Sequence, residues 1–274
     1  MFRRMAVTEP GGALRPVEVA VTDPDAGWVR VRVTASGVCG ADLGTVSASE
    51  PAGGFPITPG HEIAVPVEAL AHIPDELSEA DAAPMGCAGV TTFTAIREAG
   101  LPPGSRVAVY GLGGLGHLAV QFAARIGHEV VVIARGTDRE QDAAAFGARH
   151  YIDATAQDAG QRLAELGGAD LILCTVPTSE PISALLDGLR LRGRLTLIGV
   201  DGGAIQVPVA RLVMNAQVVT GHLTGSPADI EDTMRFAVAH DVRPRLERLP
   251  LEQAELAVRR LREGQVRYRV LLEP

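Results

Sequence analysis

The sequence predicts an α/β protein with a doubly wound parallel sheet and a second, smaller β domain. Between residues 106 and 222, short apolar runs alternate with amphipathic stretches, which is the pattern of strands joined by crossover helices. A glycine-rich turn separates the first run from the first helical stretch, and residues 1–36 read as short strands broken by turns. With 274 residues, the chain can form one large domain or two modest ones.

Short strands are expected in residues 1–36, because turn-forming clusters interrupt an alternation of apolar and polar residues. The alternation is clearest from Trp28 to Val33, which predicts a half-buried strand. Residues 37–62 are rich in Gly, Pro and Ser, so they are expected to be irregular. The sequence therefore predicts a β-rich, loop-rich start to the chain.

The next segment leads toward the parallel sheet. A short strand-like piece is expected at 63–70, and Ser78 is expected to begin a helix because acidic residues follow it directly. Residues 91–99 should form a helix that leads into the glycine-rich turn.

The alternating part of the chain yields six predicted strands and four predicted helices. The strands are expected at 106–110, 129–134, around 150–152, 170–174, 194–199 and 217–222. The helices are expected at 114–126, 138–146, 157–166 and 180–191. After residue 221 the pattern changes to helices at 227–240 and 251–263 and a closing strand at 268–272.

The glycine-rich turn at 111–116 has the spacing of a dinucleotide site and lies between a predicted strand and a predicted helix. In such a site Gly111 permits the tight turn, Gly113 lets the backbone approach a pyrophosphate, and Gly116 lets the helix pack closely on the strand. The helix N-terminus offers free N–H groups to the phosphates. The cofactor-binding residues expected in this turn also include Leu112, Gly114 and Leu115. The plainer alternative is a glycine-rich turn in any α/β protein.

Composition argues against several classes of partner, and the cysteine count favours a reduced cytoplasmic setting. The net charge of −8 argues against nucleic acid or an anionic membrane surface as the main partner. No apolar run is long enough to span a bilayer, and two arginines near the start are not followed by the apolar stretch of a secretory signal. The three cysteines, Cys39, Cys87 and Cys174, are too few and too far apart for a disulfide framework. A small molecule is the expected partner.

Several stretches together resemble the zinc alcohol dehydrogenase branch of the medium-chain dehydrogenase/reductases. They are residues 37–43 (GVCGADL), 59–62 (PGHE), 73–78 (IPDELS), 82–92 (AAPMGCAGVTT) and the glycine turn with His117. The resemblance implies a GroES-like catalytic domain at 1–92, a Rossmann NAD(P)-binding domain at 93–223, and a segment at 224–274 that packs back on the catalytic domain. It also implies a homodimer or homotetramer.

The resemblance assigns a catalytic zinc to Cys39, His61 and Cys87. Two thiolates and one imidazole leave one open position on a tetrahedral zinc, which is the ligand count of a catalytic site. By resemblance, Glu62 lies behind the ligands or becomes an alternate ligand, and Asp42 orients a ligand imidazole. On spacing alone, the alternative is that both cysteines are buried apolar thiols and His61 is a hydrogen-bonded core residue.

The chain departs from the family pattern in two places. Ala41 stands where the family usually has a Ser or Thr whose hydroxyl starts a proton relay, so proton release would need water or another group. After Glu62 the chain runs almost directly into sequence that lies well beyond the remaining barrel strands and the four-cysteine lobe of the family. We therefore expect no structural zinc, and a shortened barrel whose strand edges must be covered, for example by a subunit partner.

The end of the second strand of the dinucleotide unit bears on the choice between NADP and NAD. Ala134 stands where an acidic residue would bind the adenosine ribose, and Arg135 follows it. Without the carboxylate, Arg135 or Arg139 could pair with a 2′-phosphate, which favours NADP. Asp138 could still reach the ribose hydroxyls, and Arg135 could equally be a solvated loop residue, so NAD stays open.

Other residues are expected to line the nicotinamide or to be structural. Gly199 and Val200 follow a strand at the carboxyl end of the sheet, where ligands bind in open α/β folds. Thr91 lies near the nicotinamide by resemblance, although a threonine on an apolar helix is an equal alternative. Cys174 ends a strand and is expected to be a small buried residue.

Together these observations favour a zinc-assisted, NAD(P)-dependent oxidoreductase acting on an alcohol, aldehyde or ketone. The main alternative is a dinucleotide-binding sensor or accessory subunit whose catalytic domain has decayed, as Ala41 and the shortened barrel suggest. A second alternative is a zinc-free reductase of activated double bonds such as quinones or enones, although relatives of that type normally lack the Cys/His/Cys set.

Overall fold

The computed structural model describes residues 1–24, 29–49, 54–60, 70–179 and 181–274. The chain divides into two compact units. The first comprises Met1–Gly86, Ser226–Met234 and Pro244–Pro274, and the second comprises Cys87–Gly225 and Arg235–Arg243. None of the helices in the described part of the chain is long and apolar enough to cross a membrane.

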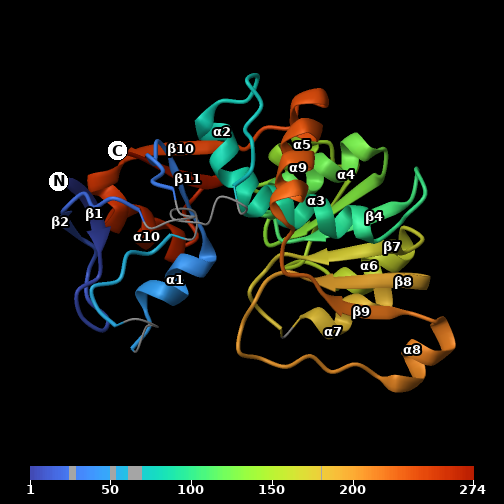
Figure 1. Ribbon diagram of the computed structural model, residues 1–274. Helices are drawn as coiled ribbons and strands as arrows, with labels where there is room; N and C mark the ends of the chain where they lie inside the picture. The colour runs from blue at the N-terminus through green and yellow to red at the C-terminus, as the bar shows by residue number, and fades with distance from the viewer. Residues whose placement is uncertain (25–28, 50–53, 61–69, 180) are drawn as a thin grey trace. The chain divides into compact units, whose positions relative to one another are not determined.

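The second unit is built on a six-stranded parallel sheet with the order β6-β5-β4-β7-β8-β9 (Figure 1). Its strands are β4 (Arg106–Tyr110), β5 (Glu129–Ala134), β6 (His150–Asp153), β7 (Ala169–Cys174), β8 (Leu189–Leu197) and β9 (Val218–Gly221). The strand order reverses between β4 and β7, because the chain starts at the centre of the sheet and builds outward in both directions. Such a reversal creates the crevice at which open α/β sheets bind ligands.

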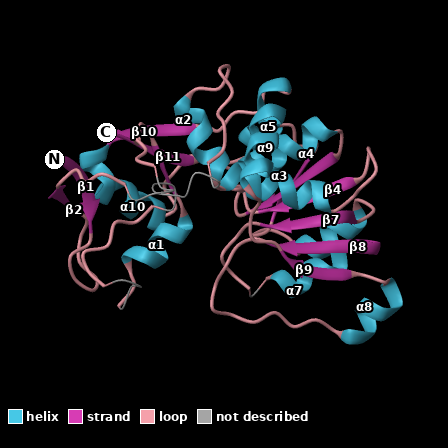
Figure 2. Ribbon diagram, viewed as in Figure 1, coloured by secondary structure: helices cyan, strands magenta, loops and turns pink. Residues whose placement is uncertain are grey.

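Helices cover both faces of this sheet (Figure 2), as the predicted crossovers require. The helices of the second unit are α3 (Ala88–Glu98), α4 (Gly116–Ile126), α5 (Glu140–Phe146), α6 (Ala159–Glu165), α7 (Ile182–Leu185) with the 3₁₀ turn η3 (Leu186–Gly188), part of α9 (Pro227–Ala239), and α8 (Val209–Asn215), which lies beyond β9. Aromatic rings join three of them, since the ring of Phe93 lies 5.3 Å from that of Phe122 and 5.0 Å from that of Phe236. The fold class predicted for this half is confirmed.

The sequence prediction was wrong at the end of the sheet. The predicted helix at 180–191 stops at Gly188 among its described residues, and its last residues begin β8 instead. Leucines at 185, 186, 189 and 191 suit either a helix or a strand, so periodicity could not locate the change.

Helix α8 was not predicted, and none of its residues is buried. Without a buried face it lacks the amphipathic pattern that would have indicated it.

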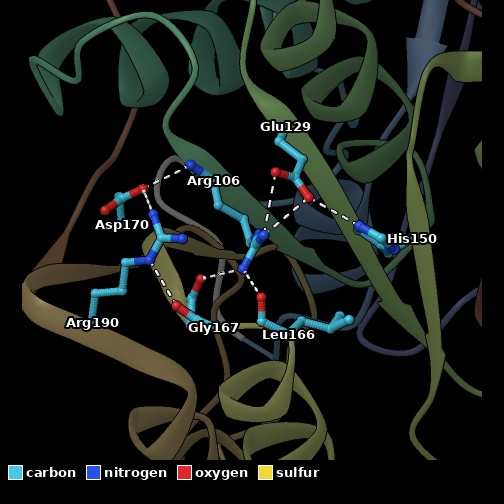
Figure 3. Close-up of polar contacts among 8 residues, drawn as sticks. Arg106, Glu129, His150, Leu166, Gly167, Asp170 and Arg190 are labelled. Atoms are coloured by element: carbon cyan, nitrogen blue, oxygen red, sulfur yellow. Dashed lines mark hydrogen bonds and ion pairs between the residues drawn. The ribbon is translucent and has the colours of Figure 1, made fainter.

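A polar cluster ties together the amino ends of the strands, at the edge of the sheet opposite the glycine turn (Figure 3). The guanidinium of Arg106 donates to the Glu129 carboxylate at 3.1 and 3.3 Å and to the carbonyl oxygens of Leu166 and Gly168. Glu129 also lies 2.9 Å from Nε2 of His150. A second pair, Arg190 and Asp170, is joined at 2.6 Å, and Asp170 accepts the backbone N–H of Arg106 at 2.7 Å.

The first unit holds two small sheets among its described residues. Strands β1 (Phe2–Ala6) and β2 (Arg15–Val19) form an antiparallel pair. In the other sheet, β11 (Arg269–Glu273) pairs with β10 (Leu246–Pro250) on one side and with β3 (Ser36–Val38) on the other. The end of the chain thus shares a sheet with a segment from its first forty residues.

Short helices complete the first unit. They are α1 (Gly40–Val46), α2 (Glu79–Ala82), the 3₁₀ turns η2 (Ala83–Gly86) and η4 (Leu251–Gln253), and α10 (Ala254–Arg262). Side chains of α10 pack with those of β1, β3 and β11 in one core, which includes Met5, Val38, Val258 and Leu272. Ser78 begins α2 as predicted, since its hydroxyl accepts the N–H of Asp81 at 3.1 Å.

Two predictions for the first unit were wrong. Residues 29–33, predicted as most of a strand beginning at Trp28, are irregular, and Trp28 itself lies outside the described residues. Alternation favours a strand only where a neighbour supplies backbone partners, and no described residue forms a ladder with this segment. The segment 37–62, predicted to be irregular, contains part of β3 and helix α1. Gly40 and Gly44 concealed this helix, because glycine is a poor helix former.

Candidate functional site

The residues predicted to bind the cofactor gather at the carboxyl edge of the six-stranded sheet. The glycine turn follows β4, Ala134 ends β5, and the segment with Gly199 and Val200 follows β8. Because these strands are parallel, their carboxyl ends lie along one edge of the sheet. Open α/β sheets bind their ligands at this edge, beside the reversal of strand order.

The glycine turn is held tightly against the segment that follows β7. Gly111 has a φ of +100°, which favours glycine, and its N–H donates to the carbonyl of Ile133 at 2.8 Å. A Cβ atom there would lie 2.5 Å from Cγ1 of Val176, and one on Gly116 would lie 1.9 Å from the carbonyl oxygen of Gly111. Thr175 donates its hydroxyl to that same carbonyl at 3.1 Å. These two glycines are therefore required by packing inside the protein.

Gly113 has a different environment, because a Cβ atom there would meet no other atom within 4 Å. It is followed by Gly114 and Leu115, whose N–H groups donate to no backbone carbonyl of the described residues. Leu112 is buried, and His117, fully buried, holds its Nδ1 3.1 Å from the carbonyl oxygen of Gly113. An open backbone with unused donors at the start of α4 suits a phosphate group.

The loop that follows β5 is braced by the neighbouring strand β6. Ala134 is buried, and its carbonyl accepts the N–H of Ala154 at 2.9 Å. The next residue, Arg135, is exposed and forms no hydrogen bond with any described residue. Gly136 donates its N–H to Oδ1 of Asp153 at 2.8 Å, while its carbonyl accepts the hydroxyl of Tyr151 at 2.8 Å.

Arg139 links this loop to the glycine turn. Its Nη1 donates a hydrogen bond to the carbonyl oxygen of Leu112. The two arginines predicted as partners of a 2′-phosphate thus differ, since Arg139 already binds the turn and Arg135 does not.

The segments that follow β7 and β8 lie close together. A Cβ atom on Gly199 would lie 2.1 Å from the carbonyl oxygen of Val176, and Val200 is 81% exposed. Asp201, after β8, joins the two segments because its carboxylate accepts the N–H of Ser179 at 2.8 Å, and it also accepts the N–H of Gly203 on its own segment at 3.0 Å. These hydrogen bonds lower the pKa of Asp201.

Thr91 and Cys174 are both buried in the second unit. The Thr91 hydroxyl lies 3.2 Å from that of Thr224 and 3.5 Å from the carbonyl oxygen of Leu223, so it holds the segment after β9. Burial raises the pKa of the Cys174 thiol to about 12, which makes it a poor nucleophile at neutral pH.

Cys39 directly precedes α1 and is 8% exposed. Its Sγ accepts the N–H of Ala41 at 3.4 Å, and its own N–H donates to Oδ2 of Asp42 at 2.8 Å. Asp42 thus fixes the backbone of Cys39. Zinc binds cysteine as the thiolate.

The other predicted ligands lie elsewhere in the chain. Cys87, partly exposed, directly precedes α3 at the start of the second unit. His61 and Glu62 lie outside the described residues. Within the described ranges, no three His, Cys, Asp or Glu side chains are grouped closely enough to hold a metal ion.

The first unit also contains a cavity of about 1080 Å³ with mostly apolar walls. The walls come from β1, β2, β3, the irregular segment 29–33 and the last part of the chain. Asp42 and Gly60 line it too, and they are sequence neighbours of the predicted ligands Cys39 and His61.

Four residues of interest were not predicted as site residues: Tyr151, Asp153, Asp201 and Arg269. The first three act through backbone groups of other segments, so no local motif indicates them. Arg269 is 4% exposed, and its Nε and Nη2 atoms have no hydrogen-bond partner among the described residues. An arginine within an otherwise apolar predicted strand would have indicated a residue of interest, because a buried arginine almost always needs a partner.

Comparison with known families shows two matches that overlap slightly and together span most of the chain. Residues 25–117 match the alcohol dehydrogenase GroES-like domain, and residues 114–239 match the zinc-binding dehydrogenase family.

Similar proteins are known over nearly the full length of the chain. It is 33% identical to alcohol dehydrogenase patD of Penicillium expansum over 332 aligned positions, covering 99% of this chain and 97% of that protein. It is 32% identical to alcohol dehydrogenase notN of an Aspergillus species, with the same coverage. Among solved structures, CAD from Helicobacter pylori complexed with NADP(H) superposes with a TM-score of 0.84 at 20% identity, covering 99% of this chain and 97% of that one.

Proposed function

Because the chain belongs to the zinc-type medium-chain dehydrogenase/reductase family, we propose that it transfers hydride between a nicotinamide cofactor and an alcohol, aldehyde or ketone. It is an alcohol dehydrogenase-like oxidoreductase by family.

The observation that carries the proposal is the contrast between the glycines of the turn at 111–116. Gly111 and Gly116 face atoms of the protein at less than 3 Å from a Cβ position, whereas Gly113 faces open space. Packing explains the first two glycines but not the third. A pyrophosphate that approaches the backbone at Gly113 accounts for it, and the start of α4 supplies N–H donors.

We assign the nicotinamide end of the cofactor to the segments after β7 and β8. Gly199 and Val200 would line the nicotinamide there, and Thr91 would lie near it. The nicotinamide, when bound, supplies or accepts the hydride. These residues orient the ring and exclude water from it, which is the contribution a protein makes to hydride transfer.

We assign a catalytic zinc to Cys39, His61 and Cys87, with Glu62 as an alternate ligand. The support is the donor set, two thiols and an imidazole, and the hydrogen bond from Ala41 to the Cys39 sulfur. When bound, zinc supplies a Lewis acid that polarises the oxygen of an alcohol or carbonyl. Asp42 holds the backbone of Cys39 in place and, by family resemblance, also orients the imidazole of His61.

Ala41 lacks the hydroxyl of the usual proton relay, so the proton of an alcohol substrate would leave through water. The catalytic domain is proposed to be shortened after Glu62 and to hold no structural zinc. In support, the alignment with the Penicillium relative extends over 332 positions although this chain has 274 residues. The apolar cavity of the first unit favours substrates with a substantial apolar part.

NADP is the proposed cofactor, with NAD as the alternative. Ala134 carries no charge to repel a 2′-phosphate, and the exposed Arg135 next to it can pair with that phosphate. The solved Helicobacter structure contains NADP(H).

A homodimer or homotetramer is proposed from the exposed edge of the six-stranded sheet. Strand β9 ends the sheet among the described residues, and Val218 on it is 40% exposed. Val213 and Met214 on nearby α8 are more than 70% exposed. A partner copy would cover this edge, and sedimentation velocity measures the resulting mass.

Zinc per chain, measured by elemental analysis on protein purified with ample zinc, tests the metal assignment. We expect about one zinc per chain, lost in Cys39→Ser and Cys87→Ser and kept in Cys174→Ser, because Cys174 is buried among apolar residues. Absence of zinc in the unaltered protein would overturn the assignment.

Oxidation of NADPH with a panel of aldehydes and ketones tests the activity. Tight NADPH binding without turnover would instead support a dinucleotide-binding sensor or accessory subunit. Turnover only with enones or quinones, without zinc, would support a zinc-free reductase of activated double bonds.

A further inference from the structure

Both polar backbone groups of Gly136 are held by side chains of the neighbouring strand β6. The N–H donates to Oδ1 of Asp153 at 2.8 Å, and the carbonyl accepts the hydroxyl of Tyr151 at 2.8 Å. Gly136 has a φ of +71°, a conformation that other residues rarely adopt. The two peptide units that flank the Cα atom of Gly136 are thus each held by one hydrogen bond with β6.

The fixed loop carries the two arginines nearest the expected position of the adenosine ribose. Arg135 directly precedes Gly136 and is exposed, with no hydrogen bond to any described residue. Arg139, three residues beyond Gly136, donates to the carbonyl of Leu112 in the glycine turn. The loop is therefore anchored at Gly136 and at Arg139, and Arg135 is the cation that faces solvent.

The charge of Asp153 is itself neutralised locally. Oδ1 accepts not only the N–H of Gly136 but also the N–H of Thr155 at 2.9 Å and the Thr155 hydroxyl at 2.7 Å. These hydrogen bonds, chiefly those from Thr155, lower the pKa of Asp153, so it stays ionised. Three donors on one oxygen offset much of the repulsion that this carboxylate would exert on a nearby phosphate.

We propose that Asp153, Tyr151 and Arg139 are positioning residues that aim Arg135 at the 2′-phosphate of NADP. This inference rests on the proposed function, because it needs the adenosine end of the cofactor to lie at this loop. In this arrangement only Arg135 touches the phosphate. Asp153 and Tyr151 hold Gly136, and Arg139 keeps the loop in register with the turn that takes the pyrophosphate.

The alternative is that Asp153 and Tyr151 only stabilise the end of the sheet. In that case their loss would weaken the binding of NADPH and NADH equally, since both cofactors share everything except the 2′-phosphate. A positioning role changes the ratio of the two affinities.

The test measures dissociation constants for NADPH and NADH by fluorescence titration, together with the thermal unfolding temperature. The unaltered protein should prefer NADPH, and Arg135→Ala should reduce that preference about tenfold, the loss expected for one charge-assisted contact. Asp153→Ala should reduce the preference for NADPH nearly as far. Tyr151→Phe, which removes one hydroxyl, should reduce that preference about threefold. Affinity for NADH should change less than twofold in each variant.

The double variant Asp153→Ala/Arg135→Ala separates positioning from direct contact. If Asp153 acts through Arg135, the double variant should bind NADPH no more weakly than Arg135→Ala alone. Additive losses, or equal losses for the two cofactors, would overturn the proposal. A preference for NADH in the unaltered protein would overturn it too.

A matched control removes a similar hydrogen bond elsewhere in the second unit. The exposed Asp158 accepts the N–H of Gln161 at 2.7 Å at the start of α6, so Asp158→Ala should lower the unfolding temperature without changing the cofactor ratio. If the unaltered protein binds neither cofactor, the proposed function fails first. That outcome differs from normal binding with an unchanged ratio, which contradicts only the positioning role.

Discussion

A Cβ atom on Gly116 would lie 1.9 Å from the carbonyl oxygen of Gly111. The first residue of α4 therefore rests directly on the backbone of the turn that precedes it, at a distance that no side chain permits. The carbonyl cannot move freely, because it accepts the hydroxyl of Thr175 at 3.1 Å. The pair fixes the direction in which α4 leaves the turn.

Replacing Gly116 with Ala should destabilise the second unit strongly. Either the helix or the turn must shift, and backbone shifts in a packed region cost about 3 kcal/mol or more. Urea unfolding followed by circular dichroism would measure the loss. Unfolding at the same urea concentration as the unaltered protein would show that the contact is easily relieved.

Replacing Gly113 with Ala should have the opposite profile. A Cβ atom there meets nothing within 4 Å, so stability should change by less than about 0.5 kcal/mol. Affinity for NADPH should fall at least about tenfold, because the methyl group would occupy the space assigned to the pyrophosphate. Fluorescence titration would measure the affinity for NADPH. Urea unfolding of this variant beside Gly116→Ala would compare their stabilities. Unchanged affinity would contradict the assignment of the turn.

Glu129 should make the second unit sensitive to acid. Burial alone would raise its pKa, but the hydrogen bonds from His150 and Arg106 outweigh burial, and the pKa is lower than the usual 4.5. A carboxylate with a lowered pKa stabilises the fold above pH 4.5, and that contribution is lost as the pH falls through the folded-state pKa.

Glu129→Gln should therefore be less stable at neutral pH by about 1–2 kcal/mol, and the difference should shrink below pH 4.5. Urea unfolding at several pH values would measure it. Glu165→Gln is the matched control. Glu165 forms a half-exposed ion pair with Arg162, and such a pair contributes at most about 0.5 kcal/mol to stability. A constant difference across the pH range would contradict the role of the Glu129 charge.

Cys174 should resist alkylation in the folded protein. Burial raises the pKa of its thiol to about 12, and its side chain is 1% exposed. At pH 8 almost no thiolate forms, so iodoacetamide should leave Cys174 unmodified until denaturant is added. Mass spectrometry of the peptide would report this, and modification in the native protein would show that the strand end opens.

Prediction from sequence succeeded where the signal was local. Strands β4 and β5 begin and end at the predicted residues, because both are runs of buried apolar side chains rich in valine and bounded by clear turns. The glycine turn was identified for the same reason, since strand, turn and helix are adjacent in the chain. Helix α8 was missed because it has no buried face and therefore no amphipathic pattern. The start of β8 was missed because its leucines suit either a helix or a strand.

The bracing residues of the candidate site could not be predicted, because strand order decides which segments meet. Asp153 reaches Gly136 only because β6 lies beside β5 in the sheet. Asp201 reaches Ser179 because β8 lies beside β7. Neither pair is close in the sequence, and neither belongs to a motif, so only the folded arrangement brings them together.

The contact between Asp201 and Ser179 should matter more for cofactor binding than for stability. Asp201 is exposed, and it joins the segments after β7 and β8 by accepting the N–H of Ser179. Its loss should cost less than about 1 kcal/mol in stability, because exposed residues contribute little to packing. The segment that carries Gly199 and Val200 would be released, so affinity for NADPH should fall about fivefold in Asp201→Ala.

Asp201→Asn keeps one carbonyl oxygen that can accept a backbone N–H, so its affinity should be intermediate. Hydrogen exchange of residues 199–207 should rise in the same order as affinity falls, since a released segment exposes its backbone to solvent. Faster exchange with unaltered affinity would place the nicotinamide away from this segment. Unaltered exchange in Asp201→Ala would mean that Gly199, packed against Val176, holds the segment without the carboxylate.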